Sequence, residues 1–305
     1  METPFLWLGF NLFVLAAIAL DLSVFHRRPH KLKTREAITW TLVWIGLTAA
    51  FGLGILHYWG EQRSLEFFTG YVIEKALSVD NLFLFLVIFR AFAVDENIQH
   101  RILEWGILGA LVMRGAMIAA GAELIGRFSW VLYALGAFLV YAGLHMLFEK
   151  KEKMHPEENR ISRFASKHLR VTEKYRGSRF FVREGGRLFA TPLFVVLVIV
   201  EITDVTLAMD SIPAVFGITR DPFIVYTSNV FALLGLRAMY FLLAGILGRL
   251  RYLTMGLAFV LVFIGVKMIV EPWVHIPVEA SLAVVAAVLL VALCASLLVA
   301  PKPRE

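Results

Sequence analysis

Cysteine is nearly absent from the sequence. The single thiol, Cys294, lies in the last apolar segment of the 305-residue chain. One cysteine cannot form an intramolecular disulfide, a CxxC redox pair or a thiolate cluster for zinc. We interpret Cys294 as a small packing residue and expect no prosthetic group.

Long polar stretches are also scarce. Hydrophobic residues make up 59% of the chain and the mean hydropathy is +0.74, whereas soluble proteins average about 45–50% apolar residues. The apolar residues form nine blocks long enough to be membrane spans: about 5–25, 38–58, 66–90, 105–125, 129–148, 190–218, 223–247, 252–270 and 277–299. The sequence therefore predicts an all-α, polytopic helical membrane protein and not an enzyme.

Basic residues are nearly absent from every second connection between these blocks. That side holds only Arg63, Arg127 and Arg220, whereas the other side holds 23 Lys and Arg residues, twelve of them within 149–189. The positive-inside rule then predicts an external N-terminus and a cytoplasmic C-terminus in a bacterial inner membrane. The net charge of +6 reflects this topology, so we expect the lipid bilayer as a partner and no nucleic acid.

The connection 150–189 is too polar to enter the membrane. Five of its residues recur at helical spacing between basic residues: Ile161, Phe164, Ala165, His168 and Leu169. An amphipathic helix on the anionic inner leaflet and a solvated linker both fit this pattern.

Two blocks contain acidic motifs that resemble each other. Aligning EKALSVDNL (74–82) with DVTLAMDSI (204–212) pairs residues of like chemistry: Glu74 with Asp204, Asp80 with Asp210, and Asn81 with Ser211. Downstream, Arg114 matches Arg237, and YAGLHMLFE matches FIGVKMIVE with an offset that differs by one residue from that of the arginines. Two copies of a three-helix unit must be inverted relative to each other, because three is odd. Inverted repeats are typical of secondary transporters.

These repeats predict five segments along the chain. Two N-terminal helices are expected in 1–62, followed by the first copy in 63–149 and the basic cytoplasmic loop in 150–189. The second copy is expected in 190–272, and a last helix with a tail in 273–305.

Ionisable residues at bilayer depth point to function, because each costs roughly 2.5–3.5 kcal/mol on insertion scales. The candidate metal ligands are Glu74, Asp80, Asn81, Glu201, Asp204, Met209, Asp210 and Ser211. The buried bases that would serve as counter-ions or gates are Lys75, Arg114 and Arg237. Oxygen ligands with surplus negative charge suit Mn²⁺, Mg²⁺ or Ca²⁺, and the thioether of Met209 would favour manganese.

Helix geometry limits which of these residues can meet. Residues six apart lie about 240° round a helix, so Glu74 and Asp80 do not converge on one ion, whereas Glu74, Ser78 and Asn81 share a face. Convergence needs an unwound segment or two helices. Pro213 predicts a helix break, because it cannot donate to the carbonyl of Met209. Across the copies, we expect Asp80 and Asp210 to share one metal site.

A purely structural interpretation of the acids remains open. In it, Arg114 and Arg237 pair with the carboxylates and fasten helices together. The alternative is that these arginines act as a gate and fill the site when the metal leaves.

The paired motifs EKALSVDNLFLF and EITDVTLAMDSIPAVF resemble the two signatures of the TerC family of bacterial integral membrane proteins. The nine-span layout with a long basic loop between the copies is similar to the Alx-type branch. The resemblance covers nearly the whole chain and implies metal-ion homeostasis, with Mn²⁺ as the exported ion. It also implies that the acidic and amide positions of both motifs are functional.

Three functions remain to be weighed. The first is a cation exporter that works by alternating access of the two repeats, with protons as a candidate counter-ion. The second is a membrane metal-binding partner that delivers or senses manganese and transports little. The third is an intramembrane aspartyl protease using Asp80 and Asp210, which is disfavoured because neither aspartate lies in a GxGD-type motif.

We predict that a cysteine placed at Ser166 resists a membrane-impermeant thiol reagent in intact cells, whereas one placed at Glu2 reacts. The reason is the uneven distribution of basic residues between the two sides. Labelling at Ser166 would overturn the predicted orientation.

Overall fold

The structure is a computed structural model that describes residues 4–26, 34–128, 130–148, 171–172, 174–184, 187–243 and 251–298. The side chains of residues 21–26, 34, 80, 184, 243, 251 and 297 are outside this description. The first five helices are α1 (Pro4–His26), α2 (Thr34–Trp59), α3 (Glu61–Ala91), α4 (Glu96–Arg127) and α5 (Val131–Phe148). The next are α7 (Pro192–Phe216), α8 (Pro222–Leu233), α9 (Leu236–Leu243), α10 (Arg251–Val270) and α11 (Val278–Leu298).

Within the described ranges, seven segments are long and apolar enough to cross a membrane: Arg35–Trp59, Glu96–Arg127, Val131–Phe148, Pro192–Phe216, Pro222–Leu242, Tyr252–Val270 and Val278–Ser296. Pro4–Leu20 is apolar but shorter, and α3 has 31 residues interrupted by charges. The prediction of a polytopic helical membrane protein is confirmed. The count of nine spans and the inverted repeats stay predictions.

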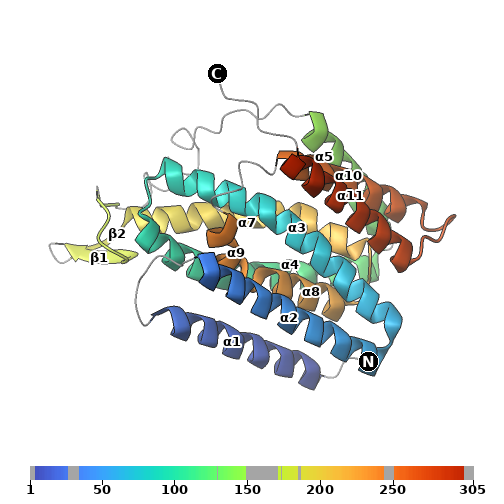
Figure 1. Ribbon diagram of the computed structural model, residues 1–305, viewed down its shortest axis with the longest axis horizontal. Coiled ribbons are helices and arrows are strands. Elements are labelled where there is room, and N and C mark those ends of the chain that lie inside the picture. Colours follow the sequence, from blue (N-terminus) through green and yellow to red (C-terminus); the bar gives the residue numbers. More distant parts are fainter. Residues whose placement is uncertain are drawn as a thin grey trace.

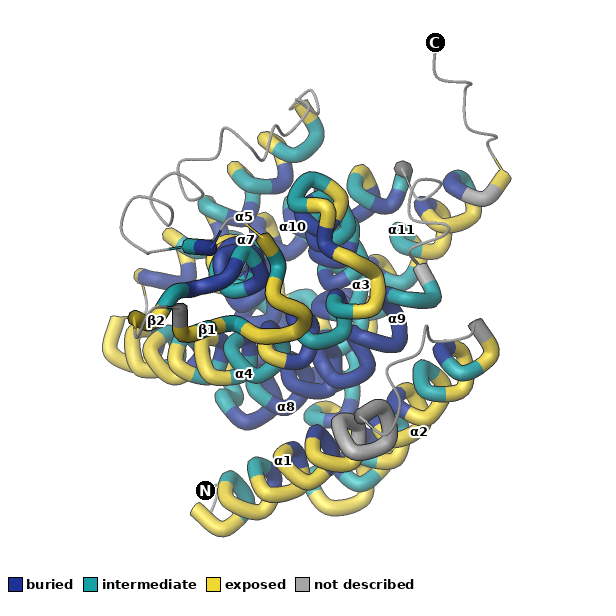
Figure 2. Tube along the Cα trace, turned by 90° about the vertical axis from the view of Figure 1, so that its left-hand side faces the viewer, coloured by how far each residue is buried: buried dark blue, intermediate teal, exposed yellow. Residues whose placement is uncertain are grey.

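The helices form a central group with a smaller group on either side. Figure 1 shows α1 and α2 on one side of α3, α4, α7, α8 and α9, and α5, α10 and α11 on the other. Of the seven segments, the one that spans α8 and α9 is the most enclosed. In its most apolar stretch 94% of the residues are buried, against 17% in that of α11. Figure 2 shows the same contrast between the buried centre and the exposed outer faces of α1 and α2.

Two apolar clusters fill the centre of the molecule. The first cluster includes Leu82, Leu103 and Val200. The second cluster includes Ile73, Ile118 and Ala208. Each of α3, α4 and α7 contributes one of these named residues to each cluster. Between the two lie Glu74 on α3, Arg114 on α4 and Asp204 on α7. Buried polar residues are therefore enclosed by apolar packing towards both ends of the bundle.

The helices α5 and α10 approach each other through glycines. A Cβ atom added at Gly136 would lie 2.9 Å from the carbonyl oxygen of Gly265, and one added at Gly265 would lie 2.6 Å from that of Gly136. Farther along, a Cβ at Gly143 would lie 2.7 Å from the carbonyl oxygen of Ala258. Small residues allow such close packing of membrane helices, where burial of apolar surface from water drives little association.

The basic connection contains a hairpin that the sequence did not predict. Strands β1 (Phe181–Glu184) and β2 (Arg187–Ala190) pair antiparallel, directly before α7. The hydroxyl of Tyr175 donates to the carbonyl oxygen of Phe92 at 2.7 Å, and burial raises the pKa of this tyrosine, which keeps the donor protonated. The candidate amphipathic helix of residues 161–169 lies outside the described residues.

We expect Gly265→Ala to cost about 1–3 kcal/mol of stability, because its methyl group would meet the backbone of α5. Thermal unfolding in detergent measures this loss. The matched control is Gly46→Ala on α2, which has nothing within 4 Å of the added atom and should be neutral or stabilising by about 0.5–1 kcal/mol. Equal behaviour of the two variants would contradict the close approach of α5 and α10.

Candidate functional site

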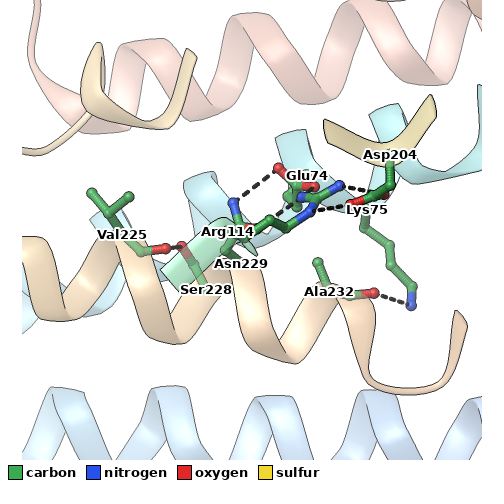
Figure 3. A network of polar contacts seen from close by, with 8 residues as sticks. All are labelled: Glu74, Lys75, Arg114, Asp204, Val225, Ser228, Asn229 and Ala232. Atoms are coloured by element: carbon green, nitrogen blue, oxygen red, sulfur yellow. Dashed lines mark hydrogen bonds and ion pairs between the residues drawn. The ribbon is translucent and has the colours of Figure 1, made fainter. Parts of the chain in front are cut away.

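The guanidinium group of Arg114, 2% exposed, organises a buried polar network (Figure 3). Its Nε and Nη2 atoms donate to Oδ2 and Oδ1 of Asp204 at 3.1 Å and 3.0 Å. Its Nη1 atom donates to Oδ1 of Asn229 at 2.8 Å and also to Oε1 of Glu74. The network closes where Nδ2 of Asn229 donates to Oε2 of Glu74 at 3.0 Å.

Four helices supply this network: α3 carries Glu74, α4 carries Arg114, α7 carries Asp204 and α8 carries Asn229. The close approach of α3 and α8 has a local cause at Gly70, one turn before Glu74. A Cβ atom there would lie 2.8 Å from Oγ of Ser228, so a larger residue would crowd α8. Asn229 is thereby brought within hydrogen-bonding distance of Glu74.

The network has more negative than positive charge. Two carboxylates, Glu74 and Asp204, face one guanidinium, and all three are at most 4% exposed. Charge-assisted, bidentate hydrogen bonds of this kind are strong, and they offset part of the cost of burying ions. The remaining formal charge of −1 favours the approach of a further cation.

Glu201, one turn before Asp204 on α7, adds a third carboxylate close by. It is half-buried, and a Cβ atom added at Gly109 of α4 would lie 2.1 Å from its Oε1 atom. The glycine therefore makes room for this carboxylate. No hydrogen bond or ion pair joins Glu201 to another residue in the described part of the chain.

Polar side chains continue along the buried faces of α3 and α7. Asn81 lies two turns after Glu74, Ser211 lies two turns after Asp204, and both are buried. The hydroxyl groups of Ser78 and Ser211 have no hydrogen-bond partner among the described residues. Because α3 and α7 run in opposite directions (Figure 1), Asn81 and Ser211 lie on opposite sides of the Arg114 network.

Two residues of α7, Met209 and Pro213, are placed differently from what their predicted roles require. Met209 is 52% exposed, on the same side of α7 as the exposed Ile202, so its thioether points away from the network. Pro213 does not break a helix, because α7 continues without interruption to Phe216. It lies in the last turn, where a missing N–H group removes one hydrogen bond without ending the helix.

A helix break occurs elsewhere, between α8 and α9. Leu234 leaves the helical path with φ −61° and ψ 132°, and Gly235 has φ +79°. A side chain on Gly235 would be strained by this φ and would meet the ring of Trp44, 2.7 Å away. Lys75, predicted as a counter-ion of the acids, donates to the carbonyl oxygens of Ala232 and Leu234 at 3.0 Å and 3.5 Å.

Arg237 pairs with an acid that lies outside both motifs. Its Nη1 atom lies 2.6 Å from Oε1 of Glu104, and both side chains are almost completely buried. Nearby, the hydroxyl of Tyr240 donates to Oε1 of Gln99 at 2.9 Å. Arg237 is therefore a counter-ion of Glu104, towards the end of the bundle where α4 begins.

The predicted pair of Asp80 and Asp210 stays a prediction, because the side chain of Asp80 is outside the described residues. Asp210 is half-buried and makes no hydrogen bond or ion pair with another described residue. Among the residues that the structure describes, no three acidic, histidine or cysteine side chains are grouped so that they could hold a metal ion.

A cavity of about 560 Å³ lies at the end of the bundle where α3 begins and α7 ends. Among the residues that line it are Glu66, Lys267 and Glu271. The carboxylate of Glu66 accepts a hydrogen bond from the hydroxyl of Thr219 at 2.5 Å. The basic-residue pattern predicts that this end faces the outside.

Comparison with known proteins identifies the family of the chain. Residues 59–304 match the family described as "Integral membrane protein TerC family". The chain belongs to the TerC family. This TerC protein is 47% identical over 296 residues to an uncharacterized membrane protein of Myxococcus xanthus, covering 97% of this chain and 93% of the relative.

Two further relatives of the TerC protein are similar over most of their length. One is Alx of Escherichia coli strain K12, named as a candidate membrane-bound redox modulator. It is 45% identical over 296 residues, which cover 94% of this chain and 92% of the relative. The other is an uncharacterized membrane protein of Rickettsia bellii, 36% identical over 292 residues, with 96% and 97% covered. No solved structure matches the chain.

Two residues of the buried networks in this TerC protein, Asn229 and Glu104, were not predicted from the sequence. Asn229 could have been noticed as an amide inside an apolar span, but the motif alignment did not include it. Glu104 precedes the predicted span 105–125 by one residue, so it lay outside the segment searched for buried charges. In both cases the partner is an arginine on a distant helix.

We expect Arg114→Gln to destabilise the TerC protein by about 3–5 kcal/mol, because it leaves two buried carboxylates without their counter-ion. Thermal unfolding in detergent measures the effect. The double variant Glu74→Gln with Arg114→Gln should lose less than the sum of the single losses, because the residues share one network.

The matched control for this prediction is Arg127→Gln. Arg127 pairs with Glu123 at 2.5 Å, but both side chains are mostly exposed, 71% and 65%. Such pairs contribute about 0–1 kcal/mol. Similar losses for Arg114→Gln and Arg127→Gln would contradict the central role of Arg114.

Proposed function

We propose that this TerC protein exports a divalent metal cation, Mn²⁺, across the inner membrane by alternating access of its two acidic motifs. One observation carries the proposal: Glu74 and Asp204, the equivalent acids of the two motifs, converge on Arg114 in the buried centre. The surplus of negative charge there suits a cation better than a purely structural ion pair, which would be electrically balanced.

In this proposal Arg114 acts as an internal cation. Its guanidinium occupies the carboxylates when no metal is bound, which avoids the cost of two unpaired buried charges. An arriving divalent cation displaces it and takes oxygen ligands from Glu74 and Asp204, with the amide oxygen of Asn229 in reach. The hydroxyl oxygens of Ser78 and Ser211 have no hydrogen-bond partner among the described residues. They are further ligands for a cation along the path.

The chemistry of these donors supports a hard cation. Carboxylate, amide and hydroxyl oxygens are preferred by Mg²⁺, Ca²⁺ and Mn²⁺. The sulfur of Met209 does not support manganese, because Met209 is exposed away from the network. Manganese is proposed because the TerC resemblance implies it.

The path on either side of the centre follows from the opposed directions of α3 and α7. Towards the cytoplasm it would pass Asn81 and the buried pair of Arg237 with Glu104. Towards the outside it would pass Ser211 and reach the 560 Å³ cavity lined by Glu66 and Glu271. We propose this cavity as the exit vestibule.

The names of the Alx relatives suggest a redox role instead. Cys294 is the only thiol of this chain and lies exposed on α11. Dithiol exchange within one chain is therefore ruled out, and we do not propose redox chemistry for its own residues.

The proposal predicts that inside-out proteoliposomes take up Mn²⁺ and that Glu74→Gln or Asp204→Asn lowers this uptake about 10- to 100-fold, which corresponds to about 1.4–2.8 kcal/mol of lost cation binding. Each change removes one negative charge from the site with little change in side-chain size. Uptake should be compared for Mn²⁺, Mg²⁺, Ca²⁺ and Zn²⁺, with and without a pH gradient.

The matched control for transport is Glu123→Gln, an exposed carboxylate on α4, which should transport like the wild type. Binding of Mn²⁺ by calorimetry without any uptake would favour a metal-binding partner that delivers or senses manganese. Normal uptake by folded Glu74→Gln and Asp204→Asn proteins would mean that these acids only fasten helices.

A further inference from the structure

The break between α8 and α9 leaves backbone carbonyl groups in the most buried segment of the protein. The last carbonyls of a helix have no intrahelical donor, and in a membrane interior each unsatisfied group costs several kcal/mol. Gly235, with its positive φ, prevents α8 from continuing smoothly into α9. The carbonyls of Ala232 and Leu234 therefore need a donor from another element.

Lys75 supplies that donor. Its ammonium group lies 3.0 Å from the carbonyl oxygen of Ala232 and 3.5 Å from that of Leu234 (Figure 3). Among the described side chains, no carboxylate lies within 4.0 Å of this ammonium as an ion-pair partner. The preceding residue, Glu74, is bound to Arg114 and Asn229. The charge of Lys75 is thus held by backbone dipoles together with the electrostatic attraction of Glu74.

The C-terminus of a helix carries a partial negative charge of about half an electron, which attracts cations. In transporters with broken helices, carbonyls at such half-helix ends coordinate monovalent ions. We propose that the α8–α9 break of this protein is a monovalent-cation site whose ligand is built into the chain, with the ammonium of Lys75 as a tethered cation.

The two acidic motifs differ at this position in the way that the proposal requires. The residue equivalent to Lys75 in the second motif is Val205. The helix equivalent to α8 and α9 in the first copy is α4, which is unbroken from Glu96 to Arg127. The lysine is present where a helix is broken, and an apolar residue stands where the helix is continuous.

A tethered cation makes the broken helix independent of dissolved ions. The break keeps its geometry in any salt, because its cation cannot diffuse away. Removing the side chain should convert a permanent site into one that dissolved monovalent cations must fill. This inference does not rest on the proposed export of manganese, and its test requires no transport.

The test measures thermal unfolding of purified Lys75→Ala protein in detergent with rising concentrations of ammonium, methylammonium or potassium ions. We expect a lower melting temperature than for the wild type, and recovery of most of this loss with small cations. Tetramethylammonium, which has no N–H donor and is larger, should not restore stability. The wild-type melting temperature should not respond to the choice of cation.

Three variants test alternative explanations. Lys75→Met fills the space with an uncharged chain, so it should be destabilised and not rescued. Lys75→Gln offers a neutral N–H donor, and full stability of this variant would overturn the need for a charge. Lys267→Ala removes another buried lysine, 4% exposed, that has no carbonyl contact among the described residues. Equal rescue of Lys267→Ala, or no rescue of Lys75→Ala by any small cation, would also overturn the proposal.

Discussion

The arrangement of the central helices depends on the burial of one guanidinium group between two carboxylates. Arg114 cannot lose its proton and cannot reach water, so its charge must be balanced by groups that other helices bring to it. Glu74, Asp204 and Asn229 do this from α3, α7 and α8. The apolar clusters towards both ends exclude water, which strengthens the attraction inside and raises the cost of separating the four helices.

Two adjacent residues of α3 hold different parts of the same partner. Glu74 binds Asn229 within α8, and Lys75 binds the carbonyls where α8 ends. A shift of α3 relative to α8 must disturb both contacts together. The charge balance at Arg114 and the geometry of the helix break are therefore mechanically linked, which is a useful property for a protein that we propose to alternate between two states.

The two acidic motifs are similar in sequence but do not have the same surroundings. Glu74 and Asp204 occupy equivalent positions of the two motifs and meet at Arg114. The equivalent arginine, Arg237, pairs with Glu104 nearer one end of the bundle. Among the described residues, a buried ion pair therefore lies on one side of the centre and a 560 Å³ cavity lies on the other.

Sequence alone determined the helical membrane class, the approximate bounds of the helices and the two helix faces that carry buried polar residues. Those features depend on local hydropathy and on the 3.6-residue period, which a single chain segment already contains. Only the tertiary structure decided which acids meet, because Arg114 is 40 and 90 residues away from its partners. Tertiary packing also placed the helix break at Gly235 and not at Pro213, since the break needs both a residue with positive φ and Lys75 from another helix to satisfy the freed carbonyls.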